Sequence, residues 1–142
     1  MKILLIEDND LNRKLVEKII QRTGHHFLAA ADALSGIAAA RVEKPALILM
    51  DIDLPGMDGI TATGILKRDP ATCLIPVIAF TASAMKGDRE AILSAGFDDY
   101  ISKPIGYHDF VDRLDKWLGK DHAAGTKPSG DVIDERNEDE RA

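Results

Sequence analysis

Five side chains that could do chemistry each stand at or near the end of a short apolar run: Glu7, Asp8, Asp51, Thr81 and Lys103. Clustered carboxylates repel one another and raise one another's pKa unless a cation lies among them. Mg²⁺ suits such a cluster because it binds one or two carboxylates and keeps several waters. A lysine ammonium suits a phosphoryl oxygen, and a threonine hydroxyl can donate to one. If these side chains meet, they predict phosphoryl transfer onto a carboxylate, giving an aspartyl-phosphate.

Short apolar runs alternate with helix-length segments along residues 1–119. The expected strands are Ile3–Ile6, Phe27–Ala31, Ala46–Met50, Val77–Phe80 and Tyr100–Ile101. The expected helices are Leu11–Ile20, Leu34–Val42, Ile60–Leu66, Met85–Ala95 and Phe110–Leu118. Strands without polar alternation, separated by helices, predict an α/β fold with a parallel sheet covered on both faces. Sites in open sheets of this kind lie beyond the carboxyl ends of the strands, where the five side chains are expected to converge.

The composition excludes several classes of protein. A chain of 142 residues, 45% apolar and 30% charged, predicts one globular domain with or without a tail. Its longest apolar runs, of four or five residues, are too short to cross a membrane. A net charge of −6 gives no overall electrostatic reason to bind nucleic acid, and no P-loop motif is present. The single cysteine, Cys73, cannot form an internal disulfide, which fits a reducing cytoplasm.

Residues 120–142 differ from the rest of the chain in composition. They include seven acidic and four basic residues, and Val132 and Ile133 are their only large apolar residues. Such a segment buries too little apolar surface to offset the entropy of ordering it. We therefore expect a globular domain at residues 1–119 and an acidic, disordered, solvated tail at residues 120–142.

Four segments together resemble the receiver domain of two-component response regulators: Glu7-Asp8-Asn9, MDIDLPGMDG around Asp51, Thr81-Ala82 and Lys103-Pro104. Each motif is weak alone, but the set is specific and covers roughly residues 1–119. The stretches EDNDLN, AMKGDRE and YISKPI look most like single-domain receivers of the DivK type and receivers attached to hybrid kinases. The resemblance implies a flavodoxin-like receiver fold, with a five-stranded parallel sheet of order 2-1-3-4-5 flanked by five helices.

The resemblance implies a role for each matching acid. Asp51 would be the phosphoacceptor and would share in binding Mg²⁺. Asp8 would ligate the metal directly, Glu7 through water, and Asp53 through its backbone carbonyl. The acidic side chain of Asp53 also adds negative charge at the mouth of the site, where it could tune metal affinity or dephosphorylation.

The remaining matches concern the active state. Thr81 would bond the phosphoryl group, Lys103 would pair with it, and Tyr100 would be the switch aromatic. The helix Met85–Ala95 would shift easily, because it has few large apolar anchors, mainly Met85, Ile92 and Leu93.

Simpler interpretations of some residues stay open. Thr81 could be the N-cap of the following helix, although Ser83 is equally placed for that duty. Tyr100 could be a half-buried strand residue with its hydroxyl in water. Asp58-Gly59 is expected to be a helix cap and a turn. The histidines, which include His25, show no metal-ligand spacing and are expected at the surface.

The function implied by the resemblance is that of a cytoplasmic response regulator. It would accept a phosphoryl group from a sensor histidine kinase or histidine phosphotransfer protein and would lose it by autodephosphorylation, without being a conventional turnover enzyme. Its output would be phosphorylation-dependent binding of a downstream protein, because the tail is too short for a DNA-binding domain. Neither direct DNA binding nor membrane insertion is expected.

Two alternatives remain. The chain could be a phosphorelay shuttle that passes the phosphoryl group to a histidine phosphotransfer domain. It could also be an interaction module that works without phosphorylation, although the intact set of site residues argues against this. A haloacid-dehalogenase-like hydrolase would need a DxDx[TV] run, and Asp51–Pro55 lacks the final Thr or Val.

Overall fold

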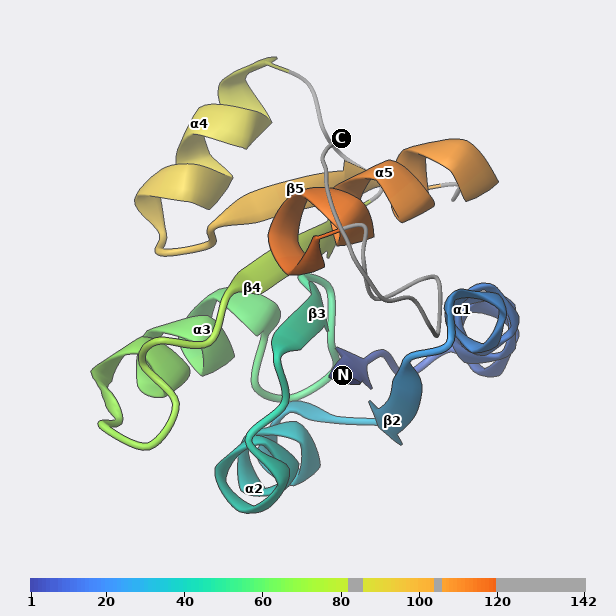
Figure 1. The fold of residues 1–142 in the computed structure, drawn as a ribbon. Helices are drawn as coiled ribbons and strands as arrows, with labels where there is room; N and C mark the ends of the chain where they lie inside the picture. Colours follow the sequence, from blue (N-terminus) through green and yellow to red (C-terminus); the bar gives the residue numbers. More distant parts are fainter. Residues whose placement is uncertain (82–85, 104–105, 120–142) are drawn as a thin grey trace.

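The computed structural model describes residues 1–81, 86–103 and 106–119, in which five strands alternate with five helices (Figure 1). The strands are β1 (Lys2–Ile6), β2 (His26–Ala30), β3 (Leu47–Asp51), β4 (Val77–Thr81) and β5 (Asp99–Ser102). The helices are α1 (Asp10–Thr23), α2 (Ala33–Glu43), α3 (Gly59–Arg68), α4 (Lys86–Ser94) and α5 (Tyr107–Leu118). The predicted alternation is therefore confirmed, with boundaries that differ from the expected ones by at most three residues.

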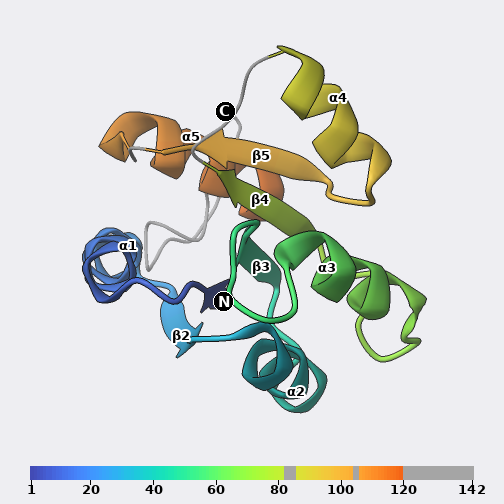
Figure 2. The ribbon, with the colours of Figure 1, turned by 180° about the vertical axis from the view of Figure 1, so that it is seen from behind.

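The five strands form one parallel sheet of order β2-β1-β3-β4-β5 (Figure 2). This confirms the predicted 2-1-3-4-5 order of a flavodoxin-like receiver fold. The register pairs Ile6 with Met50, and Asp51 with Phe80. Because the strands run the same way and end in register, the residues that follow β1, β3 and β4 emerge at one edge of the sheet.

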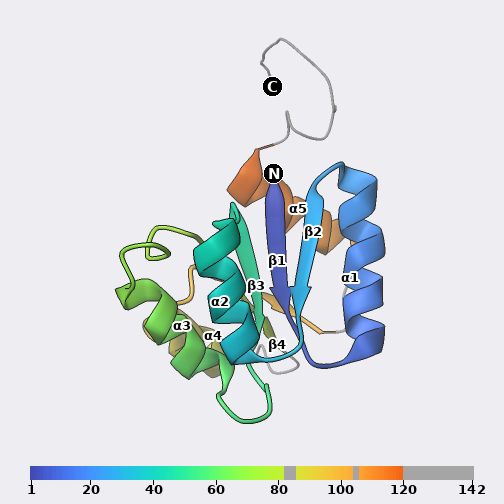
Figure 3. The same ribbon diagram turned by 90° about the horizontal axis from the view of Figure 1, so that it is seen from below.

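Successive side chains of β1 point into two separate apolar cores. Ile3 and Leu5 pack with residues of α1 and α5, whereas Leu4 and Ile6 pack with residues of α2, α3 and α4. Figure 3 shows the sheet between α2 and α3 on one side and α1 on the other. All four side chains are fully buried, which explains why the strand sequence lacks polar alternation.

Side chains and a glycine define the ends of α1 and the start of α3. The Asn9 side chain caps α1 by accepting from the backbone N–H of Asn12, and Gly24 ends that helix with a φ of 83°. The left-handed region suits glycine, which has no Cβ to clash there. Asp58 caps α3 by accepting from the N–H of Thr61 at 2.7 Å, as predicted from the Asp-Gly pair.

Two expectations about burial are wrong. Leu93 is 47% exposed, so Ile92 is the only buried side chain among residues 89–94 of α4. His25 is buried, because the tight connection from α1 into β2 encloses it. Ser83, Met85 and the predicted tail lie outside the described residues. Within the described ranges, no helix is both long enough and apolar enough to cross a membrane.

Candidate functional site

Three carboxylates meet where β1 and β3 end. One oxygen from each of Glu7, Asp8 and Asp51 lies within 4.8 Å of the other two. Glu7 and Asp51 are 0% and 2% exposed, while Asp8 is exposed. The meeting follows from the topology, because β1 and β3 are parallel neighbours that end in register. The structure thus brings these three predicted side chains together.

Lys103 joins the carboxylates from the end of β5. Its Nζ lies 3.2 Å from Oε1 of Glu7 and 3.3 Å from Oδ1 of Asp51. Its backbone N–H donates to the Thr81 carbonyl at 2.7 Å, and its Nζ lies 4.8 Å from the centre of the Phe80 ring. Burial alone lowers the pKa of Lys103, but the two carboxylates outweigh burial and raise it. The ammonium therefore stays charged beside them.

Glu7 is held by the start of α1. The Asn9 N–H donates to Oε2 at 3.1 Å, Asn12 Nδ2 donates to Oε1 at 3.3 Å, and Arg13 donates to the Glu7 carbonyl at 2.7 Å. Burial raises the pKa of Glu7, the neighbouring Asp51 raises it further, and the Asn9 bond offsets this only in part. The supporting roles of Asn12 and Arg13 go beyond the sequence prediction, although both residues stand at the start of the helix that follows Glu7.

The loop after β3 folds back around Asp51. The Asp53 N–H donates to Oδ1 of Asp51 at 3.1 Å, while the Asp53 side chain is exposed. Gly59, the first residue of α3, comes so close that a Cβ there would overlap the carbonyl oxygen of Asp51 and approach Cα of Ile52 to 2.9 Å. Gly59 therefore does more than form the predicted turn, because it lets α3 begin directly against the backbone of Asp51.

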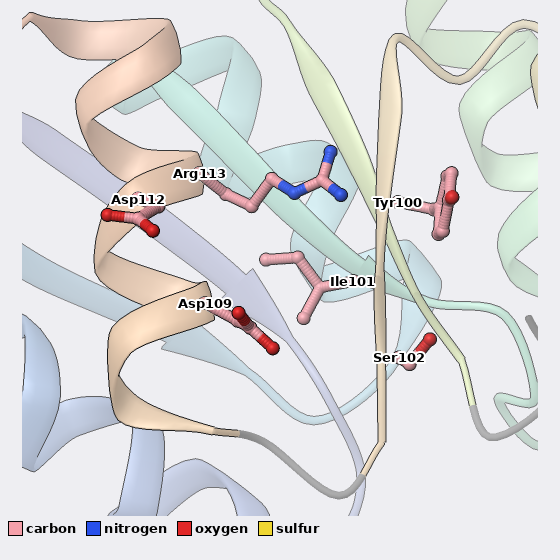
Figure 4. A pocket seen from close by; sticks show the side chains of 6 residues that line it. All are labelled: Tyr100, Ile101, Ser102, Asp109, Asp112 and Arg113. Carbon is pink, nitrogen blue, oxygen red and sulfur yellow. The ribbon is translucent and has the colours of Figure 1, made fainter.

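Thr81 and Tyr100 lie on the two neighbouring strands. Thr81 is the last residue of β4, is 3% exposed, and pairs with Ser102 of β5. Tyr100 is half-buried on β5 and lines a cavity of about 360 Å³ together with Arg113 of α5 (Figure 4). The sheet register therefore brings Thr81 to the same edge as Asp51, while Tyr100 lies farther back along β5.

The donor set fits a magnesium ion. The carboxylates of Glu7, Asp8 and Asp51 supply the hard oxygen ligands that Mg²⁺ prefers. Lys103 contributes one positive charge against three carboxylates, so the cluster is left with a net negative charge. Burial and the neighbouring Asp51 both raise the pKa of Glu7. A divalent cation among the carboxylates would lower that pKa again, because it favours their charged form. The backbone carbonyl of Asp53 is not one of the clustered carboxylate oxygens, and it stays a predicted ligand.

The family model of the response regulator receiver domain matches residues 3–115. The chain belongs to this family. The match runs from β1 into α5, so it spans the whole sheet and the carboxylate cluster. Phosphorylation and Mg²⁺ binding are typical of receiver domains, and the donor set described above agrees with both.

The chain is also similar to curated response regulators over nearly their full length. The polar-differentiation response regulator DivK of Brucella anthropi is 43% identical over 117 residues, which cover 82% of this chain and 95% of the relative. DivK of Brucella ovis gives the same identity and the same coverage. The predicted similarity to receivers of the DivK type is thereby confirmed.

Solved structures agree with the fold. The receiver domain of a sensor histidine kinase from Pseudomonas aeruginosa PAO1 has a TM-score of 0.77 and 36% identity, covering 83% of this chain and 97% of that one. That receiver carries a magnesium ion coordinated in its active site cleft. A putative response regulator from Chloroflexus aurantiacus has a TM-score of 0.78 and 26% identity, covering 82% and 96% of the two chains. The predicted similarity to receivers of hybrid kinases is consistent with the first of these.

Proposed function

We propose that the chain accepts a phosphoryl group on Asp51 from a phosphohistidine donor and signals in the cytoplasm by binding a protein partner. The observation that carries this proposal is the position of Asp51 among Glu7, Asp8 and Lys103 at the carboxyl edge of the sheet. Burial of Asp51 and Glu7 strengthens each electrostatic contact there relative to water. The family membership makes this chemistry the expected one.

The transfer step exchanges one bond to phosphorus for another. A carboxylate oxygen of Asp51 attacks the phosphorus, the new O–P bond forms, and the N–P bond of the phosphohistidine breaks. The imidazole leaves with the electron pair of the broken bond and is neutral once it holds a single proton. Lys103, 3.3 Å from Asp51, would pair with a phosphoryl oxygen in the product.

Glu7, Asp8 and Asp51, with the carbonyl of Asp53, would hold Mg²⁺. The ion supplies positive charge that offsets the charge of the transferred group. The Asp53 N–H donates to Oδ1 of Asp51, which fixes the direction of the carboxylate and leaves its other oxygen for attack. Lys103 and the start of α1 hold Glu7 at the metal side of the cluster.

The output would be a change of shape on the side of the sheet formed by α4, β5 and α5. Thr81 would bond the phosphoryl group, and Tyr100 would turn inward into the space that Thr81 vacates. Among residues 89–94 of α4, Ile92 is the one buried side chain, which supports a shift of this part of the helix because few buried contacts resist it. Thr81→Ala should therefore still be phosphorylated yet lose phosphorylation-dependent partner binding.

A phosphorelay shuttle is the second candidate, since the same site can pass a phosphoryl group onward. A transfer assay separates the two: labelled protein is mixed with candidate histidine phosphotransfer domains, and label on the acceptor histidine is followed with time. Rapid, complete back-transfer to a cognate domain would favour the shuttle. If the chain works without phosphorylation, wild type and Asp51→Asn should bind the partner protein with the same affinity.

A screen against autophosphorylated sensor kinases tests the proposal as a whole. Wild-type protein should take label from at least one kinase within seconds to minutes, and Asp51→Asn should take none. Label that appears on Asp51→Asn at the wild-type rate would contradict the proposed acceptor.

A further inference from the structure

Tyr100 is held at the surface by arginines from two different helices. Arg89 of α4 donates from Nη1 to the Tyr100 hydroxyl at 2.8 Å, and its Cζ lies 5.7 Å from the ring centre. Arg113 of α5 places its Cζ 5.4 Å from the same ring centre. Both guanidiniums are within the range of cation–π attraction. The ring therefore links α4 and α5 across β5.

The two arginines differ in how firmly they are fixed. Arg113 donates to Oδ1 of Asp99 at 2.6 Å, and Asp99 is only 5% exposed (Figure 4 shows the Arg113 side chain reaching from α5 toward β5). Arg89 is exposed and belongs to α4, where Ile92 is the one buried side chain among residues 89–94. Arg113 is thus the fixed side of the contact, and Arg89 moves with α4.

The packing around Tyr100 leaves its rotamer to these polar contacts. A cavity of about 360 Å³ borders the ring beside Arg113, and a second of about 350 Å³ borders it beside Arg89 and Leu93. Close-packed cores fix rotamers by contact on all sides, which this ring does not have. The two arginines therefore contribute much of the free energy that favours the outward rotamer of Tyr100.

We propose that Arg89 is a latch, a positioning residue that holds Tyr100 outward and sets how readily the chain switches. The proposal rests on the proposed function, in which Tyr100 turns inward on phosphorylation. A shift of α4 carries Arg89 away from the hydroxyl, and the hydroxyl in turn resists that shift. Because the contact stabilises only the resting state, its removal moves the equilibrium toward the active state.

Two readouts test the latch, with one exposed neighbour as control. The first is the strength of nuclear Overhauser contacts between the Tyr100 ring and the methyl groups of Leu93, which border the same cavity in the outward position. The second is the affinity for the phosphoryl mimic beryllofluoride with Mg²⁺. The variants are Arg89→Ala, Arg89→Lys and, as the control on the same cavity wall, Glu90→Gln.

Arg89→Ala should weaken the Tyr100–Leu93 contacts without ligand and raise the beryllofluoride affinity about threefold to tenfold, the worth of one exposed hydrogen bond and one exposed cation–π contact. Arg89→Lys, which keeps a charge and a donor, should restore most of both values. Glu90→Gln should change neither.

Unchanged Tyr100–Leu93 contacts in Arg89→Ala would overturn the latch. Weakened contacts with unchanged affinity would also overturn it, since the arginine would then hold the ring without setting the switch. If no variant, wild type included, binds beryllofluoride, the proposed function fails instead. The ligand-free contacts then still decide whether Arg89 holds Tyr100 outward, and the part of the proposal that concerns switching fails with the proposed function.

Discussion

Asp99 should be the acid on which the stability of the domain depends most. Its carboxylate is 5% exposed and accepts from Trp117 Nε1 at 2.8 Å, from Arg113 at 2.6 Å and from Lys116 at 3.3 Å. The backbone N–H of Tyr100 donates to it at 2.9 Å. These contacts join β5 to α5, the helix that covers the sheet beside α1. Asp99→Asn removes the charge and turns an amide N–H₂ toward some of these donors.

The unfolding free energy lost in Asp99→Asn depends on how exposed the side chains that contact Asp99 are. Removing one member of a buried ion pair costs about 3–5 kcal/mol. Here Arg113 and Lys116 are 34% and 60% exposed, so solvent screens their part. The part-buried Trp117 bond and the weakened Arg113 bond then account for about 2–3 kcal/mol of lost unfolding free energy. For a domain of this size, that corresponds to a fall of about 10 °C in Tm.

The pH dependence identifies the carboxylate as the cause. Burial alone raises the pKa of Asp99, but the Trp117 and Tyr100 hydrogen bonds and the Arg113 charge outweigh burial and lower it. A lowered folded-state pKa gives stability that is complete above the unfolded pKa of about 4 and is lost as the pH falls through the folded value. The difference between wild type and Asp99→Asn should therefore be constant above pH 5 and shrink below about pH 4.

Urea unfolding at several pH values, followed by the fluorescence of Trp117, the only tryptophan, measures this difference. Asp112 is an exposed acid on α5, the helix that carries the partners of Asp99. Asp112→Asn is therefore the matched control and should change the unfolding free energy little. A loss of unfolding free energy below about 0.5 kcal/mol in Asp99→Asn, within the range of ordinary surface substitutions, would show that the Asp99 carboxylate does not stabilise the domain as proposed. So would a larger loss that stays the same from pH 6 to pH 3.

Three further predictions concern the metal, the tail and the first turn of α3. EDTA should stop phosphorylation by acetyl phosphate without unfolding the chain by circular dichroism, and Asp8→Ala should slow it more than Glu7→Ala; full-rate labelling in EDTA would contradict the metal site. Truncation after Lys120 should leave Tm and phosphorylation nearly unchanged, since the removed residues offer little apolar surface; a large drop in Tm would show that the tail packs on the domain. Gly59→Ala should lower the unfolding free energy by about 2 kcal/mol, because the new Cβ overlaps the backbone of Asp51. Gly64→Ala on the same helix meets only the end of a flexible arginine and should be neutral or stabilising in urea unfolding. Equal effects of the two substitutions would rule out the overlap.

The pattern of the chain predicts the sheet because its inner strands, β1, β3 and β4, are buried on both faces. Ile3–Ile6 and Leu47–Met50 read as continuous apolar runs, and runs of that kind separated by helices have few folded solutions other than a parallel sheet. The strand order came from the resemblance, since periodicity does not distinguish one order from another. The burial of single residues outside the inner strands is harder to predict. Leu93 is apolar yet half-exposed, and His25 is polar yet buried, because tertiary packing decides both.

The main site was predictable for a related reason, while its surroundings were not. Parallel strands end together, so acids that follow β1 and β3 must approach each other. The contacts of Arg13 with Glu7, and of Gly59 with Asp51, depend on how the next helix leaves the sheet. The contacts of Asp99 with Trp117 and of Arg89 with Tyr100 join consecutive elements, but they depend on how α4 and α5 pack against β5. No local pattern encodes such contacts, and only the packed structure reveals them.

Mapping the phosphorylated residue tests the assignment of Asp51 as the phosphoacceptor most directly. Wild-type protein is incubated with acetyl phosphate and Mg²⁺, the acyl phosphate is reduced with borohydride, and the peptide carrying homoserine is identified by mass spectrometry. We expect one phosphoryl group per chain and homoserine at position 51, with no incorporation in Asp51→Asn and near-normal incorporation in Asp53→Asn, its exposed neighbour. Homoserine at Asp8 or Asp53, or undiminished incorporation in Asp51→Asn, would contradict this assignment.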